Sequence, residues 1–237
     1  MKYGLIFATM SVAIIVVLIE NADNEFICLW LAATFATLSL GYFGIGGSIF
    51  GKRPDGTLRA INVALMLPYL LLLWVTWHGL RRLRRNAPYQ ELTNGILIGR
   101  RLLPAEFPPG VASVFDLACE FVEPRQIRRL AYHSCPVLDG AAPNVEQLLE
   151  WARLVLVAPK PTFIHCAEGH GRTGLLAATV LIEIGDTESA SDALRLVQSK
   201  RPSVRLQRVQ MKCPEQAATR IHSERIKIQE SKNDQAT

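Results

Sequence analysis

Charged residues are missing from three long stretches near the start of the chain. Residues 3–19, 26–51 and 60–80 contain no Asp, Glu, Lys or Arg over 17, 26 and 21 positions. A helix of about 20 apolar residues is long enough to cross a bilayer. One such run could be a cleaved signal peptide, but three in succession exclude that explanation for the set. Buried core helices are the alternative. We expect a transmembrane helical region at 1–85, with spans at about 3–19, 26–50 and 60–80.

Cysteine is scarce, and its spacing carries no metal-binding pattern. The five cysteines lie at positions 28, 119, 135, 166 and 213, with no C-x-x-C pair and no cysteine–histidine cluster. We therefore expect no disulfide framework, no metal and no cofactor. A disulfide between Cys166 and either Cys119 or Cys135 under oxidising conditions stays open, although ordinary buried thiols are the simpler interpretation.

The downstream part of the chain has no excess of positive charge. From residue 91 onward, 18 Lys and Arg stand against 17 Asp and Glu, so most of the net charge of +5 arises beside the apolar runs. Arg81, Arg82, Arg84 and Arg85 follow the third run directly, without interleaved aromatic residues. This placement favours contact with anionic lipid headgroups and argues against nucleic-acid binding.

Beyond a linker at 86–93, the pattern changes to that of a folded α/β domain at 94–222, followed by a polar tail at 223–237. β-prone runs alternate with segments of helical periodicity, which predicts a central sheet with helices on both faces. Asn144 is a suitable N-cap, with Gln147 three residues later. The expected strands are 95–99, 111–117, 131–138 and 162–165, and the expected helices are 144–157, 172–184, 188–200 and 204–220.

One stretch of this domain carries specific chemistry. After the strand at 162–165 the chain reads HCAEGHGRTG, from His165 to Gly174, and a helical run follows. A strand that turns tightly into a helix directs backbone N–H groups and the positive helix end into one cup. Glycines allow that curvature, and the planar Arg172 side chain can bind two oxygens of a phosphate. The loop therefore predicts a phosphate site above Cys166, lined by Ala167, Glu168, Gly169, His170, Gly171 and Arg172.

Cys166 is the expected nucleophile at this site. Helix N-termini and neighbouring cations lower the pKa of a thiol from about 8.5 to roughly 3.5–7.5. A thiolate in this cup can attack phosphorus, while Arg172 and the loop amides stabilise the charge of the transferring group. We expect the Thr173 hydroxyl to hydrogen-bond the thiolate and His165 to orient the loop through a ring hydrogen bond.

The segment resembles the signature loop of the cysteine-based tyrosine and dual-specificity phosphatases, Cys-x5-Arg-[Ser/Thr], including the flanking His and Gly. The resemblance covers about residues 94–210 and implies a dual-specificity-phosphatase-like fold acting on phosphoproteins. The N-terminal region is unlike the soluble members and resembles membrane-attached bacterial relatives.

A phosphocysteine mechanism also needs a general acid. Asp139 follows a strand end in PVLDGAAP, where Gly140 and Pro143 shape a loop, and the family's acid lies in a similar upstream loop. Asp116 is the rival, although its sequence context suggests a structural turn. Gln207 or Gln210 could position the hydrolytic water, but the match of RPSVRLQRVQ to the family's segment is loose.

Several functions stay open beside the protein phosphatase. Membrane attachment also fits a phospholipid substrate, either phosphatidylglycerophosphate or a phosphoinositide. Relatives selective for phosphoinositides carry lysines in the loop, so Glu168 and His170 disfavour a polyphosphorylated inositol. A rhodanese-like sulfurtransferase and a non-catalytic phosphate-binding membrane module are the remaining alternatives, and the oligomeric state is undetermined.

The distribution of basic residues does not determine how three spans would be oriented in the membrane. Lys2, Lys52, Arg53 and Arg59 would lie on one side, and the four arginines at 81–85 on the other. Because a thiolate enzyme needs reducing surroundings, we expect a multi-pass protein of the cell membrane with its catalytic domain on the cytoplasmic face. Two spans with one interfacial or re-entrant segment form the alternative topology.

Overall fold

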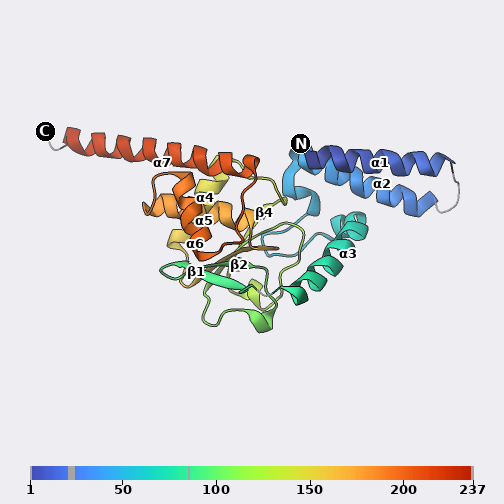
Figure 1. Ribbon diagram of the computed structural model, residues 1–237, viewed down its shortest axis with the longest axis horizontal. Helices are drawn as coiled ribbons and strands as arrows, with labels where there is room; N and C mark the ends of the chain where they lie inside the picture. The colour runs from blue at the N-terminus through green and yellow to red at the C-terminus, as the bar shows by residue number, and fades with distance from the viewer. Residues whose placement is uncertain (1, 21–24, 85, 236–237) are drawn as a thin grey trace.

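Three apolar helices precede a sheet domain in the computed structural model, which describes residues 2–20, 25–84 and 86–235 (Figure 1). The helices are α1 (Lys2–Glu20), α2 (Glu25–Leu40) and α3 (Ala60–Leu83). After α2 the chain continues through a π-helical turn, η1 (Gly41–Ile45), and a 3-10 turn, η2 (Gly46–Phe50). By length and composition, α1, α2 with its two turns, and α3 could each cross a membrane.

Polar side chains join these helices, while apolar ones face outward. The Ser11 hydroxyl of α1 donates to Ala32 O at 2.9 Å, and the Thr34 hydroxyl of α2 donates to Leu65 O of α3 at 2.8 Å. Such interhelical hydrogen bonds are common between membrane helices. Ile19 and Phe26 are 79% and 88% exposed, and an exposed apolar surface of this kind is compatible with a membrane environment.

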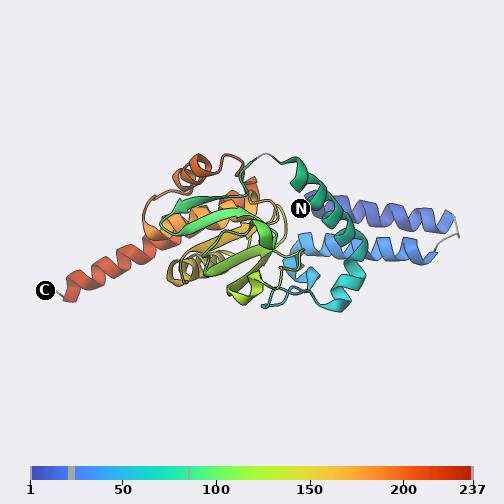
Figure 2. The ribbon, with the colours of Figure 1, turned by 90° about the horizontal axis from the view of Figure 1, so that it is seen from below.

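The three helices are not parallel to one another. α1 and α2 lie side by side as an antiparallel pair that points away from the sheet domain (Figures 1 and 2), and α3 is inclined to this pair, lying below it in Figure 1 and crossing it in Figure 2. The N-terminal end of α1 and the turns after α2 therefore lie at the sheet domain, while the C-terminal end of α1 is distant from it.

The sheet has five strands in the order β1-β2-β5-β3-β4. Its strands are β1 (Tyr89–Thr93), β2 (Ile96–Arg100), β3 (Ser113–Ala118), β4 (Ala131–Val137) and β5 (Thr162–Cys166). Only the β1–β2 pair is antiparallel; the other pairs are parallel, with β5 between β2 and β3. The carboxyl ends of β3, β4 and β5 consequently meet at one edge, where ligands of α/β sheets usually bind.

The α-helices of this domain cover one face of the sheet rather than both. They are α4 (Val145–Val157), α5 (Gly171–Ile184), α6 (Ala190–Lys200) and α7 (Arg208–Gln235). Their apolar residues form one core with sheet residues such as Ile98, Phe115 and Ile164. The other face packs Val114 and Phe163 against Leu102, Phe107 and Ile127, which belong to loops and short 3-10 turns. The expected α/β fold is confirmed with this correction.

Most predicted elements of this domain are present. Asn144 caps α4 as expected, because its side chain accepts from Gln147 N at 2.8 Å. Two segments differ from the expectation. Residues 89–93, assigned to the linker, form β1, and most of the polar tail continues α7 to Gln235; residues 236–237 lie outside the described residues. Arg225 donates to the Ile182 and Glu183 carbonyls, and this contact ties the start of the tail to α5.

Candidate active site

The loop between β5 and α5 places Cys166 at the end of a central strand. Its side chain is buried, and the sulfur accepts a hydrogen bond from the backbone N–H of Gly169 at 3.2 Å. This bond turns a loop amide toward the sulfur, as a bowl that binds an anion requires. The helix α5 begins immediately afterward at Gly171, so its positive end also faces the loop.

Glycine is required at position 169 because of its backbone conformation and because there is no room for a Cβ. Its φ is +68°, and a Cβ at this position would lie 2.4 Å from the carbonyl carbon and oxygen of Gly99 on β2. The loop is also held from behind by Arg201, which is buried after α6. The Arg201 Nε donates to Gly169 O at 2.8 Å, and its Nη1 donates to Gln90 Oε1 of β1 at 2.5 Å. The sequence pattern did not identify this support.

Arg172 is fully buried in the first turn of α5 and is oriented by Glu120. The Arg172 Nη1 and Nη2 donate to the two oxygens of Glu120 at 2.8 and 2.7 Å, and Nη1 also donates to Val137 O at 3.0 Å. Burial alone would lower the pKa of Arg172, but the Glu120 carboxylate outweighs that effect and raises it well above its usual value. The Nε atom has no hydrogen-bond partner among the described residues, so this donor is available to a phosphate oxygen.

Asp139 lies beside this arginine, as a general acid should. Its Oδ1 is 3.3 Å from Arg172 Nη2, and its side chain is 78% exposed. It lines a cavity of about 480 Å³ together with Cys166, His170 and Gln210. The loop after β4 thus brings a solvent-accessible carboxylate to the same opening as the sulfur.

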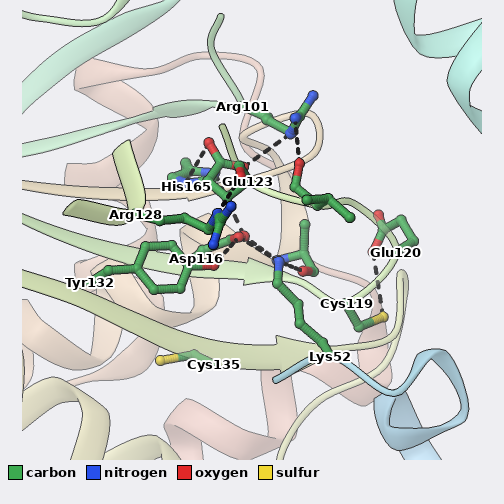
Figure 3. Close-up of polar contacts among 12 residues, drawn as sticks. Lys52, Arg101, Asp116, Cys119, Glu120, Glu123, Arg128, Tyr132, Cys135 and His165 are labelled. Carbon is green, nitrogen blue, oxygen red and sulfur yellow. Dashed lines mark hydrogen bonds and ion pairs between the residues drawn. The ribbon is translucent and has the colours of Figure 1, made fainter. Parts of the chain in front are cut away.

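His165 belongs to a buried polar cluster behind the loop (Figure 3). Its Nδ1 lies 3.8 Å from Asp116 Oδ1 and its Nε2 4.0 Å from Glu123 Oε1, distances longer than a hydrogen bond. Burial lowers the pKa of His165 to about 4, so the ring is neutral at physiological pH. The ring hydrogen bond to the loop stays a prediction.

Three acidic residues in the segment 116–123 each bind a base from a different part of the chain. Asp116 Oδ2 accepts from Lys52 Nζ at 2.5 Å, and both side chains are inaccessible to solvent. Glu120 binds Arg172 as described above. Glu123 Oε2 accepts from Arg101 Nε at 3.0 Å. Only one of the three bases, Lys52, comes from the N-terminal region, where it precedes α3.

Asp116, Glu123 and His165 are residue types that bind metals, and one donor atom from each lies within 4.8 Å of the others. Asp116 pairs with Lys52 and Glu123 with Arg101, so both carboxyl groups of this cluster already have a basic partner within the protein. Asp116 also accepts from the Ala118 N–H at 2.8 Å and from the Tyr132 hydroxyl at 2.7 Å. Asp116 is therefore fully engaged within the protein, whereas Asp139 is exposed at the opening, and its role as the general acid stays a prediction.

Comparisons with known proteins agree with this geometry. Residues 110–186 match a family model described as a polymorphic toxin system DSP-PTPase phosphatase. Over 85 residues the chain is 36% identical to protein tyrosine phosphatase PRL-1 of Leishmania major, covering 31% of this chain and 48% of that protein. The crystal structure of Tk-PTP in the active form is similar at 25% identity with a TM-score of 0.51, over 56% of this chain and 97% of that one.

This chain is similar to the cysteine-based dual-specificity and tyrosine phosphatases, in sequence over residues 110–186 and in the fold of its sheet domain. It spans about half the length of the L. major relative. The structure of PTPMT1 in complex with PI(5)P shares the fold, with 15% identity and a TM-score of 0.50 over 58% of this chain and 98% of that one.

Other predicted residues of the phosphatase loop make contacts within the protein. The Thr173 hydroxyl donates to Gly99 O at 3.4 Å, so its bond to the thiolate stays a prediction. Glu168 forms an ion pair with Arg84. Gln210 is buried and donates to Ala141 O at 3.1 Å, whereas Gln207 is exposed and donates to the Tyr3 hydroxyl at 3.0 Å.

The remaining cysteines of the phosphatase domain are free and buried. Burial raises the pKa of Cys119 and of Cys135 well above the usual value of a thiol. Both thiols therefore stay protonated at neutral pH. This favours the interpretation that they are ordinary buried thiols rather than disulfide partners of Cys166.

The N-terminal helices reach the phosphatase loop directly. The Trp77 indole N–H of α3 donates to Ala167 O at 3.1 Å, and the Tyr42 hydroxyl after α2 donates to Asp139 O at 3.0 Å. Neither residue belongs to the signature motif. The apolar helices thus contact both the loop that holds the nucleophile and the loop that holds the acid.

Proposed function

We propose that this chain hydrolyses phosphate monoesters through a phosphocysteine intermediate. The observation that carries the proposal is the Cys166 sulfur bonded to a loop amide, beside an arginine that Glu120 holds in place. In the first step the Cys166 thiolate attacks phosphorus, and the bond to the leaving oxygen breaks as Asp139 supplies its proton. In the second step a water attacks phosphorus, Asp139 takes a water proton, and phosphate and the thiolate are released.

Two classes of substrate are proposed, phosphoproteins and phospholipids. Protein tyrosine phosphatase PRL-1 supports a phosphoprotein substrate, in keeping with the dual-specificity reading of the loop. PTPMT1, solved with PI(5)P, supports a phospholipid through its fold only. Both classes of substrate present a phosphate monoester, so the proposed reaction is the same for either.

Membrane attachment is proposed from the exposed apolar helices, and the contacts of the phosphatase domain favour two spans. Lys52 precedes α3 and pairs with Asp116, while Arg84 follows α3 and pairs with Glu168. Both ends of α3 thus contact the same domain, which supports an interfacial α3 and a spanning pair formed by α1 and α2.

This topology removes the ambiguity in the charge pattern. Tyr3 at the start of α1 contacts Gln207, so the start of the chain shares the side of the phosphatase domain. The described basic residues of the N-terminal region then all lie on that side, which the positive-inside rule assigns to the cytoplasm. These residues are Lys2, Lys52, Arg53, Arg59, Arg81, Arg82 and Arg84; Arg85 lies outside the described residues.

Hydrolysis of para-nitrophenyl phosphate by the detergent-solubilised protein tests the proposed activity. We expect Cys166→Ser to abolish turnover while phosphate binding persists, and Arg172→Lys to lose most activity because an ammonium cannot bind two oxygens at once. Asp139→Asn should slow alkyl phosphates more than aryl phosphates, whose leaving groups need less protonation. Thiosulfate turnover without phosphatase activity would instead support the sulfurtransferase, and phosphate binding without either activity would support the non-catalytic module.

A further inference from the structure

A second cavity, of about 260 Å³, lies where the N-terminal helices meet the phosphatase domain. Ligand pockets generally measure about 300–1,000 Å³, so this cavity suits part of a molecule rather than the whole of a large one. Tyr3 and Phe7 of α1 line it from positions one turn apart, and so do Leu38 of α2 and Tyr42 beyond it. Residues four apart lie on the same face of a helix, so one face of each of these segments forms part of the cavity wall.

α3 supplies the longest wall of this cavity. Leu73, Thr76 and Leu80 line it at spacings of three and four residues, which place them on one face of the helix. Val75, on a different face, is 55% exposed and is not part of the lining. α3, the helix that crosses the α1–α2 pair in Figure 2, thus lines one side of this cavity.

The other end of the cavity is polar and belongs to the catalytic site. Glu120, Asp139 and Arg172 line it there. Asp139 and Glu168 line both this cavity and the neighbouring one that contains Cys166. A substrate with its phosphate over the sulfur therefore has a direct path past the acid into the space between the helices.

The apolar end offers little to a polar ligand. The Tyr42 hydroxyl and the Trp77 indole already donate to Asp139 O and Ala167 O. The Thr76 hydroxyl donates to Leu72 O at 2.8 Å, and the Tyr3 hydroxyl accepts from Gln207. Among the described residues, the hydroxyls of Tyr3 and Tyr69 are the lining groups of this end that donate no hydrogen bond. A peptide backbone entering this space would lose water for few new partners, which is costly, whereas a hydrocarbon chain would not.

We propose that this cavity receives the hydrocarbon chain of a membrane lipid whose headgroup ends in a phosphate monoester, with that phosphate bound above Cys166. The inference rests on the proposed phosphatase function and names its substrate class. The apolar faces of α1 and α2, exposed to lipid, supply the route by which such a chain enters from the bilayer. A phosphorylated protein is the competing substrate and becomes an outcome of the test.

The experiment compares two substrates of the full-length protein in detergent micelles. One is a phosphomonoester lipid, tested as phosphatidate, phosphatidylglycerophosphate and PI(5)P, and the other is para-nitrophenyl phosphate. The variant Thr76→Trp fills the cavity from an exposed helix position, and Val75→Trp adds the same side chain one residue away, outside the lining. The readout is the ratio of kcat/KM for the lipid to kcat/KM for the aryl phosphate.

We expect Thr76→Trp to lower this ratio by about tenfold or more, the effect of losing burial of roughly two methylene groups. Val75→Trp should leave the ratio within about twofold, since most surface substitutions have small effects. A second measurement uses monoalkyl phosphates of increasing length, for which kcat/KM should rise with chain length in the parent protein and stay flat in Thr76→Trp.

Each failure has its own signature. If the parent protein does not hydrolyse para-nitrophenyl phosphate, the proposed function itself is wrong. If it does so but hydrolyses phosphotyrosine peptides and none of the lipids, the substrate inference alone is overturned. The inference is also overturned if Thr76→Trp and Val75→Trp change the lipid-to-aryl ratio equally, because membrane proximity rather than the cavity would then explain lipid turnover.

Discussion

Single residues at this site are held by buried charges that lie outside the signature motif. Glu120 binds Arg172 through both carboxylate oxygens, so the guanidinium keeps one orientation before any phosphate arrives. Such preorganisation is the main electrostatic contribution of an enzyme to a charged transition state. The Cys-x5-Arg pattern predicts that an arginine is present, but it contains no information about which acid binds it.

The conformation of Gly169 gives a test at the residue scale. Gly169→Ala should place a Cβ 2.4 Å from the Gly99 carbonyl and so displace the loop that binds the Cys166 sulfur. A displacement of about 1 Å can cost on the order of a hundredfold in rate, and we expect a loss of that size in para-nitrophenyl phosphate turnover. Gly110→Ala is the matched control, because Gly110 also has a positive φ, +77°, but has no atom within 4 Å of the added Cβ. Equal activity of the two variants would contradict this account.

The neutral ring of His165 makes stability depend on pH. Its pKa is about 4 in the folded protein against 6.5 without burial. Between these values the unfolded chain binds more protons than the folded one, so stability falls as the pH is lowered from 6.5 toward 4. Replacement by Gln removes this linkage, and the parent protein should lose about 1 kcal/mol more per pH unit than His165→Gln in this window. Melting temperatures measured from pH 7.5 to 5 provide the check; parallel curves would exclude this role for His165.

At the scale of elements, the loop between η2 and α3 joins the N-terminal region to the sheet through Lys52. Removing one partner of a buried ion pair typically costs about 3–5 kcal/mol. Lys52→Met should therefore lower the melting temperature in detergent by roughly 6–20 °C, given about 2–4 °C per kcal/mol for a protein of this size. Arg53→Met makes the same substitution at the next, exposed residue and should change it by less than about 2 °C.

A double variant separates the ion pair from other effects of the Lys52 substitution. Asp116→Asn removes the buried charge that Lys52→Met leaves unpaired. The double variant should therefore regain part of the stability lost by Lys52→Met alone. Additive losses in the two single variants would instead mean that the pair makes no contribution of its own.

Element by element, the sequence predicts local structure better than distant contacts. The N-cap at Asn144 and the strand–loop–helix around Cys166 depend on neighbouring residues, and both are present in the structure. β1 was missed because a short polar strand at a sheet edge, YQELT, has no apolar pattern of its own. The α7 extension was missed because its residues are almost all polar. Glu120, Arg201 and Lys52 were missed because each binds a partner more than 30 residues away.

At the scale of the whole molecule, the contacts of α3 bear on the proposed topology. The length and hydropathy of α3 allow a span, and from the sequence alone a third span was the natural interpretation. Contacts between segments that are distant in the sequence add to this interpretation. Lys52, which precedes α3, and Arg84, which follows it, both pair with residues of the phosphatase domain. Under the proposed topology α3 lies along the membrane surface, and the exposed aromatic residue Trp74 suits that interface.

Cysteine labelling at three positions tests this arrangement in intact cells. The parent for labelling lacks Cys28, and its remaining cysteines are buried. One cysteine at a time is then introduced in place of Glu25 in the first turn of α2, Arg53 before α3, or Arg195 on the exposed side of α6. With α3 at the interface, a membrane-impermeant maleimide added outside should label only position 25, and positions 53 and 195 should react only after the cells are opened. With three spans, positions 25 and 195 would react together and position 53 oppositely. The second pattern would also remove the cavity between the helices and the phosphatase domain, because Lys52 and Asp116 would then lie on opposite sides of the membrane.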